Sequence, residues 1–182
     1  MAGSEIAVWS WDAPLDRPLL GDDRRGLFVE GLTDASTDSV EVVLAAGKTP
    51  GFAELAGNFA AVLIRDDTLI AYSGTSAGYP LYWTNLGDEL IVSNRAASVA
   101  GVAGARIDPS GAAWLARLGY RPSGYATFQG VRQLEPGERL SANRRDGVLE
   151  VRTVTPPLAP LFDRAAGSPS ELNERIRHSF DQ

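Results

Sequence analysis

Residues 74–78 read GTSAG and match the G-x-S-x-G pattern around the nucleophilic serine of many hydrolases. In those enzymes an acid and then a histidine follow the serine along the chain. Here Ser76 is followed by Asp108, Asp163 and His178. Such a constellation would attack an ester or amide carbonyl through the serine hydroxyl, with the histidine as base.

The residues after this motif do not favour a nucleophilic serine. The pattern requires a helix directly after the serine, but residues 79–83 read YPLYW. Pro80 would interrupt a helix, and the aromatic residues favour a strand. His178, the sole histidine, falls on the polar side of a predicted helix. We interpret 74–78 as a connecting loop and keep a serine hydrolase acting through Ser76 as an alternative.

Other kinds of reactive site find little support in the composition. The chain has no cysteine, which excludes disulfides, thiolate metal sites and a cysteine nucleophile. The acidic pairs Asp22-Asp23 and Asp66-Asp67 fall in predicted turns and lack a third ligand, so we interpret them as solvated. The glycine-rich stretch lacks the Gly-Lys-Ser/Thr of a phosphate loop. We therefore expect neither a metal nor a cofactor in this chain.

The bulk composition is typical of a globular protein, with 44% hydrophobic and 22% charged residues. The net charge is −6 and the basic residues are scattered, which argues against nucleic-acid binding. No apolar run approaches the length of a membrane span. Residues 1–5 (MAGSE) lack the basic start and apolar core of a signal peptide. We expect a cytoplasmic protein that binds neither nucleic acid nor membrane.

The elements that would position any site are mostly strands. Residues 59–64 are continuously apolar, as in a strand that is covered on both faces. Residues 6–11 alternate between apolar and polar, as in a half-buried strand. Turn residues separate the later segments into hairpins. The strands expected from these signals are 6–11, 26–32, 59–64, 69–73, 81–84, 90–93, 138–142 and 148–153.

Two helices are expected among these strands. One should begin with Asp38 as its cap and Glu41 three residues later, in a capping box. The other should begin at Asp108, with Pro109 in its first turn, and end at Gly119. The residues expected to face the core are Val40, Val43 and Leu44 on the first helix and Trp114, Leu115 and Leu118 on the second.

A third helix is expected at the end of the chain. Residues 154–167 contain three prolines and are interpreted as a linker. Residues 168–171 (SPSE) form a capping box with proline at the first helical position. An apolar stripe follows at Leu172, Ile176 and Phe180, and the chain stops two residues later without a glycine stop. We expect the polypeptide to continue, with this stripe either packing on the same domain or docking onto a following one.

Four segments resemble, in order, motifs of the class II glutamine amidotransferase domains of the asparagine synthetase family. Residues 55–63 (LAGNFAAVL) resemble its L-x-G-x-F-A-f-a-l strand, and residues 79–83 resemble its K-P-L-Y-Y motif. Residues 90–94 (LIVSN) resemble l-x-f-a-S-E, and residues 130–137 (GVRQLEPG) resemble the G-v-x-x-l-x-P-G turn. The terminal helix also matches in position, because the synthetase half of that family begins with such a helix.

The resemblance implies an α+β fold, a four-layer αββα N-terminal-nucleophile hydrolase-like sandwich. Residues 1–153 would form the glutaminase-like domain, and 154–167 the linker. Residues 168–182 would be the first helix of a following synthetase domain, which this chain does not contain.

The nucleophile that the family uses is missing here. In working members, a cysteine at the mature N-terminus attacks the glutamine amide, and the free α-amine can accept the proton. Removal of the initiator methionine would expose Ala2, which has no nucleophilic atom. Ser4 could act only if two further residues were trimmed, which leaves a processed serine hydrolase as an alternative.

The binding groups of the family are also altered. Its oxyanion-hole segment, N-G-E-x-Y-N, aligns best with residues 30–34 (EGLTD), so that the anionic Glu30 would oppose a developing oxyanion. Its R-D-R-x-G stretch is SGTSA here, without charge. We therefore predict that the domain has no catalytic residue and cannot hydrolyse glutamine. Glu30, Gly31 and Gly78 would form the rim of a degenerate pocket.

Relatives with such a degenerate domain are the lasso peptide macrolactam synthetases (cyclases) and the β-lactam synthetases. Their amine comes from the substrate, and their C-terminal half binds ATP through an S-G-G-x-D-S loop, which does not occur in this chain. The resemblance implies a non-catalytic domain of an ATP-dependent amide-forming enzyme. ATP and Mg²⁺ are expected in a synthetase domain or separate synthetase subunit, and the substrate would be a peptide or small amino-acid-like molecule. A stand-alone binding or regulatory module that docks on a synthetase is the alternative.

Overall fold

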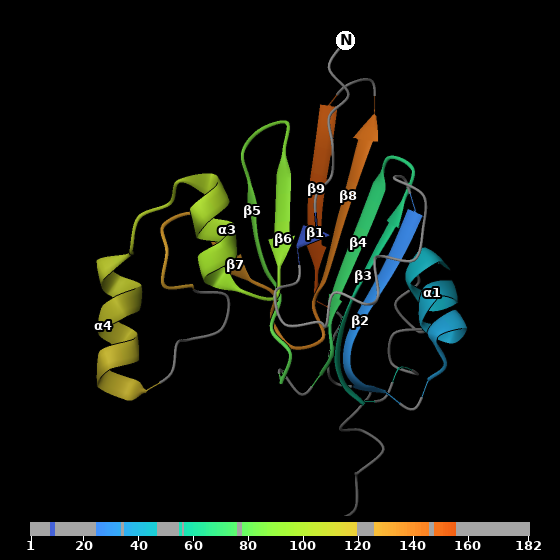
Figure 1. Ribbon diagram of the computed structural model, residues 1–182, viewed down its shortest axis with the longest axis horizontal. Helices are drawn as coiled ribbons and strands as arrows, with labels where there is room; N and C mark the ends of the chain where they lie inside the picture. Colours follow the sequence, from blue (N-terminus) through green and yellow to red (C-terminus); the bar gives the residue numbers. More distant parts are fainter. Residues whose placement is uncertain are drawn as a thin grey trace, which may run out of the picture.

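The computed structural model describes residues 8–9, 25–33, 35–46, 55, 57–75, 78–119, 126–145 and 148–155. This part of the chain forms a mixed α/β protein with two β-sheets and flanking helices (Figure 1). Its helices are α1 (Thr37–Ala46), α3 (Ala96–Ala103) and α4 (Pro109–Leu118). No helix among these residues is both long enough and apolar enough to cross a membrane.

One sheet has five antiparallel strands in the order β2-β3-β4-β8-β9. These strands are β2 (Arg25–Thr33), β3 (Gly57–Arg65), β4 (Thr68–Ser73), β8 (Arg139–Arg145) and β9 (Val148–Val154). All five strands were predicted within two or three residues of their ends. The β3–β4 turn closes at the pair Arg65 and Thr68, with Asp66 at a φ of 48°.

The other sheet has four strands in the order β1-β6-β5-β7. They are β1 (Val8–Trp9), β5 (Tyr82–Asn85), β6 (Leu90–Ser93) and β7 (Arg132–Gln133). β1 runs parallel to β6, whereas the pairs β5–β6 and β5–β7 are antiparallel. The predicted β5–β6 hairpin is confirmed. Of the predicted strand 6–11, residues 8 and 9 form β1, and its other residues lie outside the described part of the chain.

The apolar run in β3 explains how the layers are joined. Ala60, Val62 and Ile64 belong to a buried cluster that also contains residues of β5, β6 and β8, so the two sheets pack face to face. The alternate residues of β3 pack with Val40 and Leu44 of α1 on the opposite face. On the far side of the four-stranded sheet, α3 contributes to a third buried cluster. The prediction that residues 59–64 are covered on both faces is confirmed.

The start of α1 differs from the prediction. The backbone N–H of Ser39 donates a hydrogen bond to Ser36 Oγ at 3.2 Å, so Ser36 is the capping residue and Asp38 lies in the first turn. Glu41 does not close a capping box but accepts a hydrogen bond from Arg65 at 2.8 Å. The predicted inner face of this helix is confirmed: Val40 and Leu44 are fully buried, and Val43 is partly buried.

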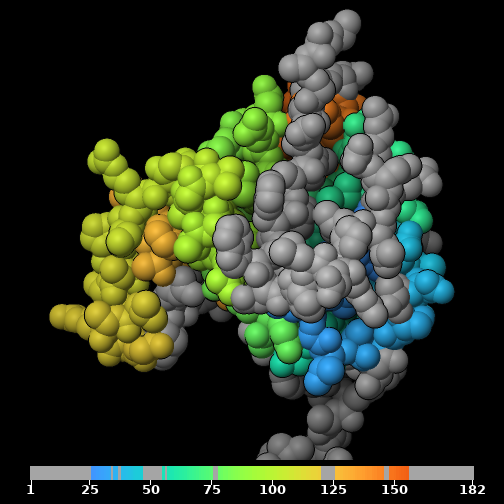
Figure 2. Space-filling view, in the orientation of Figure 1, coloured from blue at the N-terminus to red at the C-terminus, as the bar shows by residue number. Residues whose placement is uncertain are grey.

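The ends of α4 are as predicted, but its predicted core residues are not buried. Asp108 Oδ1 accepts a hydrogen bond from Ser110 N at 2.9 Å, Pro109 lies in the first turn, and Gly119 ends the helix in the left-handed conformation. The buried residue of α4 is Gly111, where a side chain would come within 2.7 Å of Ala126 O. The predicted core residues follow Gly111 along the same face, nearer the C-terminal end, and are 44–45% exposed: Trp114, Leu115 and Leu118. Figure 2 shows α4, in yellow, at the edge of the molecule.

Helix α3 has no counterpart in the prediction. It consists of alanine, valine, glycine and one serine, and Arg95 at its N-cap makes no capping hydrogen bond through its side chain. Val99 and Ala100 pack against the four-stranded sheet. Gly104 ends the helix in the left-handed conformation, but the sequence has no polar face here, so the helix depends on contacts with the sheet.

Substitution of Asp108 by alanine should remove the cap of α4. Loss of a capping side chain typically lowers the free energy of unfolding by about 1 kcal/mol. Urea denaturation of the purified protein measures the change. Asp88→Ala, in the exposed β5–β6 turn, is the matched control and should have little effect. An equal loss for both variants would contradict the capping role of Asp108.

Tyr72 should make the stability fall in alkali. Its side chain is buried beside Phe59, with ring centroids 5.7 Å apart, and this burial raises the pKa of the Tyr72 phenol. The folded protein therefore keeps the phenol proton to a higher pH than the unfolded chain does. The contribution of the Tyr72 phenol to the free energy of unfolding is complete below the unfolded pKa of about 10. Above that pH it falls by about 1.4 kcal/mol per pH unit, until the raised pKa of the folded state is reached. Urea midpoints measured on both sides of that pKa should show a shallower fall for Tyr72→Phe.

Candidate functional site

The predicted pocket residue Glu30 connects the two sheets. It lies on β2 of the five-stranded sheet, whereas Asn94 directly follows β6 of the other sheet. Asn94 Nδ2 donates a hydrogen bond to Glu30 Oε2 at 3.0 Å, and both residues are half-buried. A hydrogen bond to a carboxylate is stronger than one between neutral groups. The contact therefore fixes the position of β2 relative to the end of β6.

Gly31, the next residue on β2, is exposed to solvent, but atoms of Asn58 and Tyr79 lie close to one side of it. Its φ is +109°, and a Cβ atom there would lie 2.3 Å from Asn58 O and 2.7 Å from the ring of Tyr79. The position opposite on β3 is Phe59. Only glycine allows this approach of the backbone to its neighbours without strain.

Gly78 lies on the other side of Asn58. Its backbone N–H donates a hydrogen bond to Asn58 Oδ1 at 3.1 Å, and a Cβ atom at Gly78 would lie 2.3 Å from that amide. Tyr79, the next residue, contacts Gly31. The structure thus places Gly31 and Gly78 against Asn58, whereas the side chain of Glu30, next to Gly31, bonds Asn94. Their role as the rim of a binding pocket stays a prediction.

The chemistry of this site is dominated by acceptors. The side chain of Glu30 is a carboxylate, and Asn94 Oδ1 is buried without a hydrogen-bond partner among the described residues. The N–H of Gly78 is already taken by Asn58. An oxyanion hole needs free donors aimed at the developing charge. These groups therefore suit a donor-bearing ligand or a structural contact better than they suit acyl transfer.

Sequence reasoning missed Asn58, Asn94 and Tyr79 as members of the site. Each lies inside one of the motifs that carried the family resemblance, in LAGNF, LIVSN or YPLYW. For Asn94 the available signal was an amide side chain directly after an apolar run, because an amide that is partly buried needs partners. The pairing of Asn94 with Glu30 spans 64 positions, and no local pattern indicates it.

The serine hydrolase alternative loses support. Asp108 is engaged as the cap of α4. The residues after the motif lead into strand β5 rather than a helix, so the required strand-to-helix turn is not formed. Ser76, Asp163 and His178 lie outside the described residues, as does Ser4.

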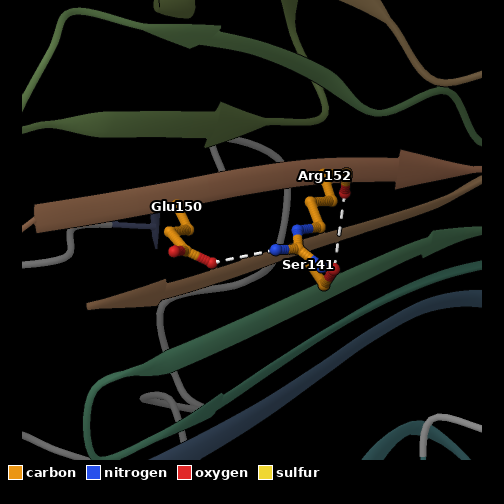
Figure 3. Close-up of polar contacts among 3 residues, drawn as sticks. All are labelled: Ser141, Glu150 and Arg152. Atoms are coloured by element: carbon orange, nitrogen blue, oxygen red, sulfur yellow. Dashed lines mark hydrogen bonds and ion pairs between the residues drawn. The ribbon is translucent and has the colours of Figure 1, made fainter. Parts of the chain in front are cut away.

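The outer face of β8 and β9 forms a second polar surface. Arg152 donates a hydrogen bond to Glu150 at 3.2 Å, and Ser141 Oγ donates to the Arg152 carbonyl at 3.4 Å (Figure 3). The side chains of Arg152 and Glu150 are 75% and 54% exposed. Exposed ion pairs of this kind contribute little to stability. We interpret this face as a solvated surface, not as a binding site.

Three residues of the terminal segment were predicted to dock onto a neighbouring domain. Leu172, Ile176 and Phe180 lie outside the described part of the chain, as does most of the predicted linker. The division of the chain at 153 and 167 thus stays a prediction.

No family model and no curated protein matches this chain. Among solved structures, one similar protein is the glutamine phosphoribosylpyrophosphate (PRPP) amidotransferase from B. subtilis, complexed with ADP and GMP. The similarity covers 70% of this chain at 16% sequence identity, with a TM-score of 0.41. It covers 28% of the amidotransferase, so this chain corresponds to less than a third of that protein.

Proposed function

We propose that this chain is a non-catalytic, glutaminase-like domain of an ATP-dependent amide-forming enzyme of the asparagine synthetase type. The observation that carries the proposal is the contact between Glu30 and Asn94. In the family motifs, the position of Glu30 is the Asn of N-G-E and the position of Asn94 is the Glu of S-E. This chain has the same two residue types in exchanged places, and they are hydrogen-bonded. The contact supports the alignment of both motifs with this chain.

The exchange also explains why the domain would be inert. It places a carboxylate where the family motif has a neutral amide donor, so charge developing on a substrate carbonyl would be repelled. The chain has no cysteine to attack an amide. In this proposal Glu30 and Asn94 are kept because they hold two sheets together, which is a structural task.

The role of the domain would then be architectural. Residues 1–153 would form the four-layer αββα N-terminal-nucleophile sandwich, 154–167 the linker, and 168–182 the first helix of a synthetase unit. The layers described above, α1, two sheets and α3, support this arrangement. The synthetase unit would bind ATP and Mg²⁺ and activate a carboxylate in the cytoplasm. Lasso peptide macrolactam cyclases and other natural-product amide ligases are the candidate parents, with peptide or amino-acid-like substrates.

A glutaminase assay tests the inert half of the proposal. Purified protein incubated with glutamine should release no glutamate or ammonia above the buffer control. Ala2→Cys should remain inactive, because the anionic Glu30 persists at the oxyanion position. Release of glutamate by the unaltered chain would refute the proposal.

The synthetase half is tested by the coding DNA and by copurification. An S-G-G-x-D-S loop is expected either downstream of Gln182 in the same frame or in a neighbouring gene. In the second case, the two co-expressed proteins should purify together. A stop codon after Gln182 with no such neighbour would contradict the proposal.

A further inference from the structure

Helix α4 has an apolar face that no described element covers. Trp114, Leu115 and Leu118 are 44–45% exposed, and Arg117 is the one charged residue of the helix. The helix meets the rest of the described chain through Gly111 in its first turns, and the same face continues to these three residues near its C-terminal end. In Figures 1 and 2 it stands at the edge of the molecule, beyond α3. A contiguous apolar helix face of this kind indicates a missing partner.

The last strand and the N-terminal end of this helix border the same hollow. Thr153, near the end of β9, lines the same hollow as Asp108, the cap of α4. Residues 156–167 then separate β9 from the predicted helix at 168–182. These twelve residues are rich in proline, and an extended proline-rich segment spans about 3.1 Å per residue, or about 37 Å in total. Helix α4 is only about 15 Å long, so the segment can reach either of its ends.

The stripe of the terminal segment fits the face of α4 in spacing and charge. Leu172, Ile176 and Phe180 recur every four residues, which gives one apolar line along a helix. Glu171 and Glu174 stand at the start of this segment.

On α4, the one cation, Arg117, lies in the last turn. An antiparallel arrangement places the acidic start beside this cation, and it also opposes the two helix dipoles favourably.

We infer that residues 168–182 form a helix that packs antiparallel on the exposed face of α4 within the same chain. Leu172 would lie against Leu118, and Ile176 against Trp114 and Leu115. The inference stands independently of the proposed function, since it requires no ligase and no glutamine chemistry.

The absence of cysteine in the chain allows an unambiguous cross-linking test. The variant with Leu118→Cys and Leu172→Cys should form an intramolecular disulfide, because facing positions bring the two Cβ atoms within bonding range. Its oxidation should be at least about tenfold faster than that of Leu118→Cys with Phe180→Cys, since effective concentration falls when the sites do not face each other. Mobility on a non-reducing gel and peptide mass mapping give the readout. Faster cross-linking of the control pair would overturn the antiparallel arrangement, and disulfide-linked dimers would assign the face to a second copy.

Hydrogen exchange provides a second measurement on the full chain. Ile176→Asp should raise the exchange of amides in residues 109–119, whereas His178→Asp, on the opposite side of the predicted helix, should leave it unchanged. Equal exchange in both variants, together with slow cross-linking of both cysteine pairs, would overturn the inference. Neither readout depends on the glutaminase assay, so the two proposals can fail separately.

Discussion

Replacing Gly31 with alanine should lower the free energy of unfolding by about 3–5 kcal/mol, the sum of left-handed backbone strain and forced displacement of packed neighbours. A Cβ atom at Gly31 would lie 2.3 Å from Asn58 O, a backbone atom of β3 that cannot move without breaking the β2–β3 ladder. It would also lie 2.7 Å from the ring of Tyr79. Urea denaturation measures the loss, and hydrogen exchange of β2 and β3 should show where the structure opens.

Gly87 offers the matched control for this substitution. Its φ is +87°, but nothing lies within 4 Å of a Cβ atom built on it. Gly87→Ala therefore introduces backbone strain alone and should lower the unfolding free energy by about 1–2 kcal/mol. The difference between the two variants isolates the steric contact at Gly31. If both variants lose the same stability, the close packing of Asn58 and Tyr79 on Gly31 does not exist in solution.

The strands were predictable because their signals are local. The continuous apolar run of β3 needs two covered faces, and the turn residues after it leave only a hairpin to form. The ends of α4 were equally well marked, since Asp108, Pro109 and Gly119 each act on backbone groups within a few residues. Such signals act within one element and do not depend on where that element lies in the fold.

The wrong predictions concern which residues of a helix are buried or capped, which depends on the rest of the fold. The stripe of Trp114, Leu115 and Leu118 indicated an amphipathic helix, but only the tertiary structure shows that Gly111 is the residue of α4 that approaches the body. For α1, the Asp38-x-x-Glu41 pattern indicated the wrong cap, because Ser36 makes the hydrogen bond. Helix boundaries read from local signals are uncertain by one or two residues.

At the candidate site, too, local motifs indicated some residues, whereas the contact between the two sheets could not be predicted. Glu30, Gly31 and Gly78 were selected by motif alignment, and the structure places the two glycines against one residue, Asn58. The partner of Glu30 could not be found in this way, because Asn94 belongs to the other sheet. Its position depends on how the two sheets pack, which the sequence of neither strand specifies.

Substitution of Asn94 by aspartate should lower the free energy of unfolding by about 3 kcal/mol at neutral pH, since it removes a donor to a carboxylate and adds a like charge. The side chain keeps its size, but an anionic oxygen then replaces the Nδ2 atom that lies 3.0 Å from Glu30 Oε2. The loss should shrink in acid, where one proton shared by the two carboxylates restores a hydrogen bond. Urea denaturation at neutral and acidic pH measures both effects.

The double variant Glu30→Gln with Asn94→Asp is the control that identifies the contact. It reverses the direction of the hydrogen bond, because the glutamine amide can now donate to the aspartate while the pair keeps its shape and a single negative charge. We expect the double variant to recover most of the stability that Asn94→Asp loses. Its difference in unfolding free energy from the unaltered protein should be similar at neutral and acidic pH. A positive interaction energy in this double-mutant cycle would establish that the two sheets are joined at this point. If the stability losses of the two single variants simply add, Glu30 and Asn94 do not interact. The hydrogen bond between the exchanged residue types would then no longer support the proposed function.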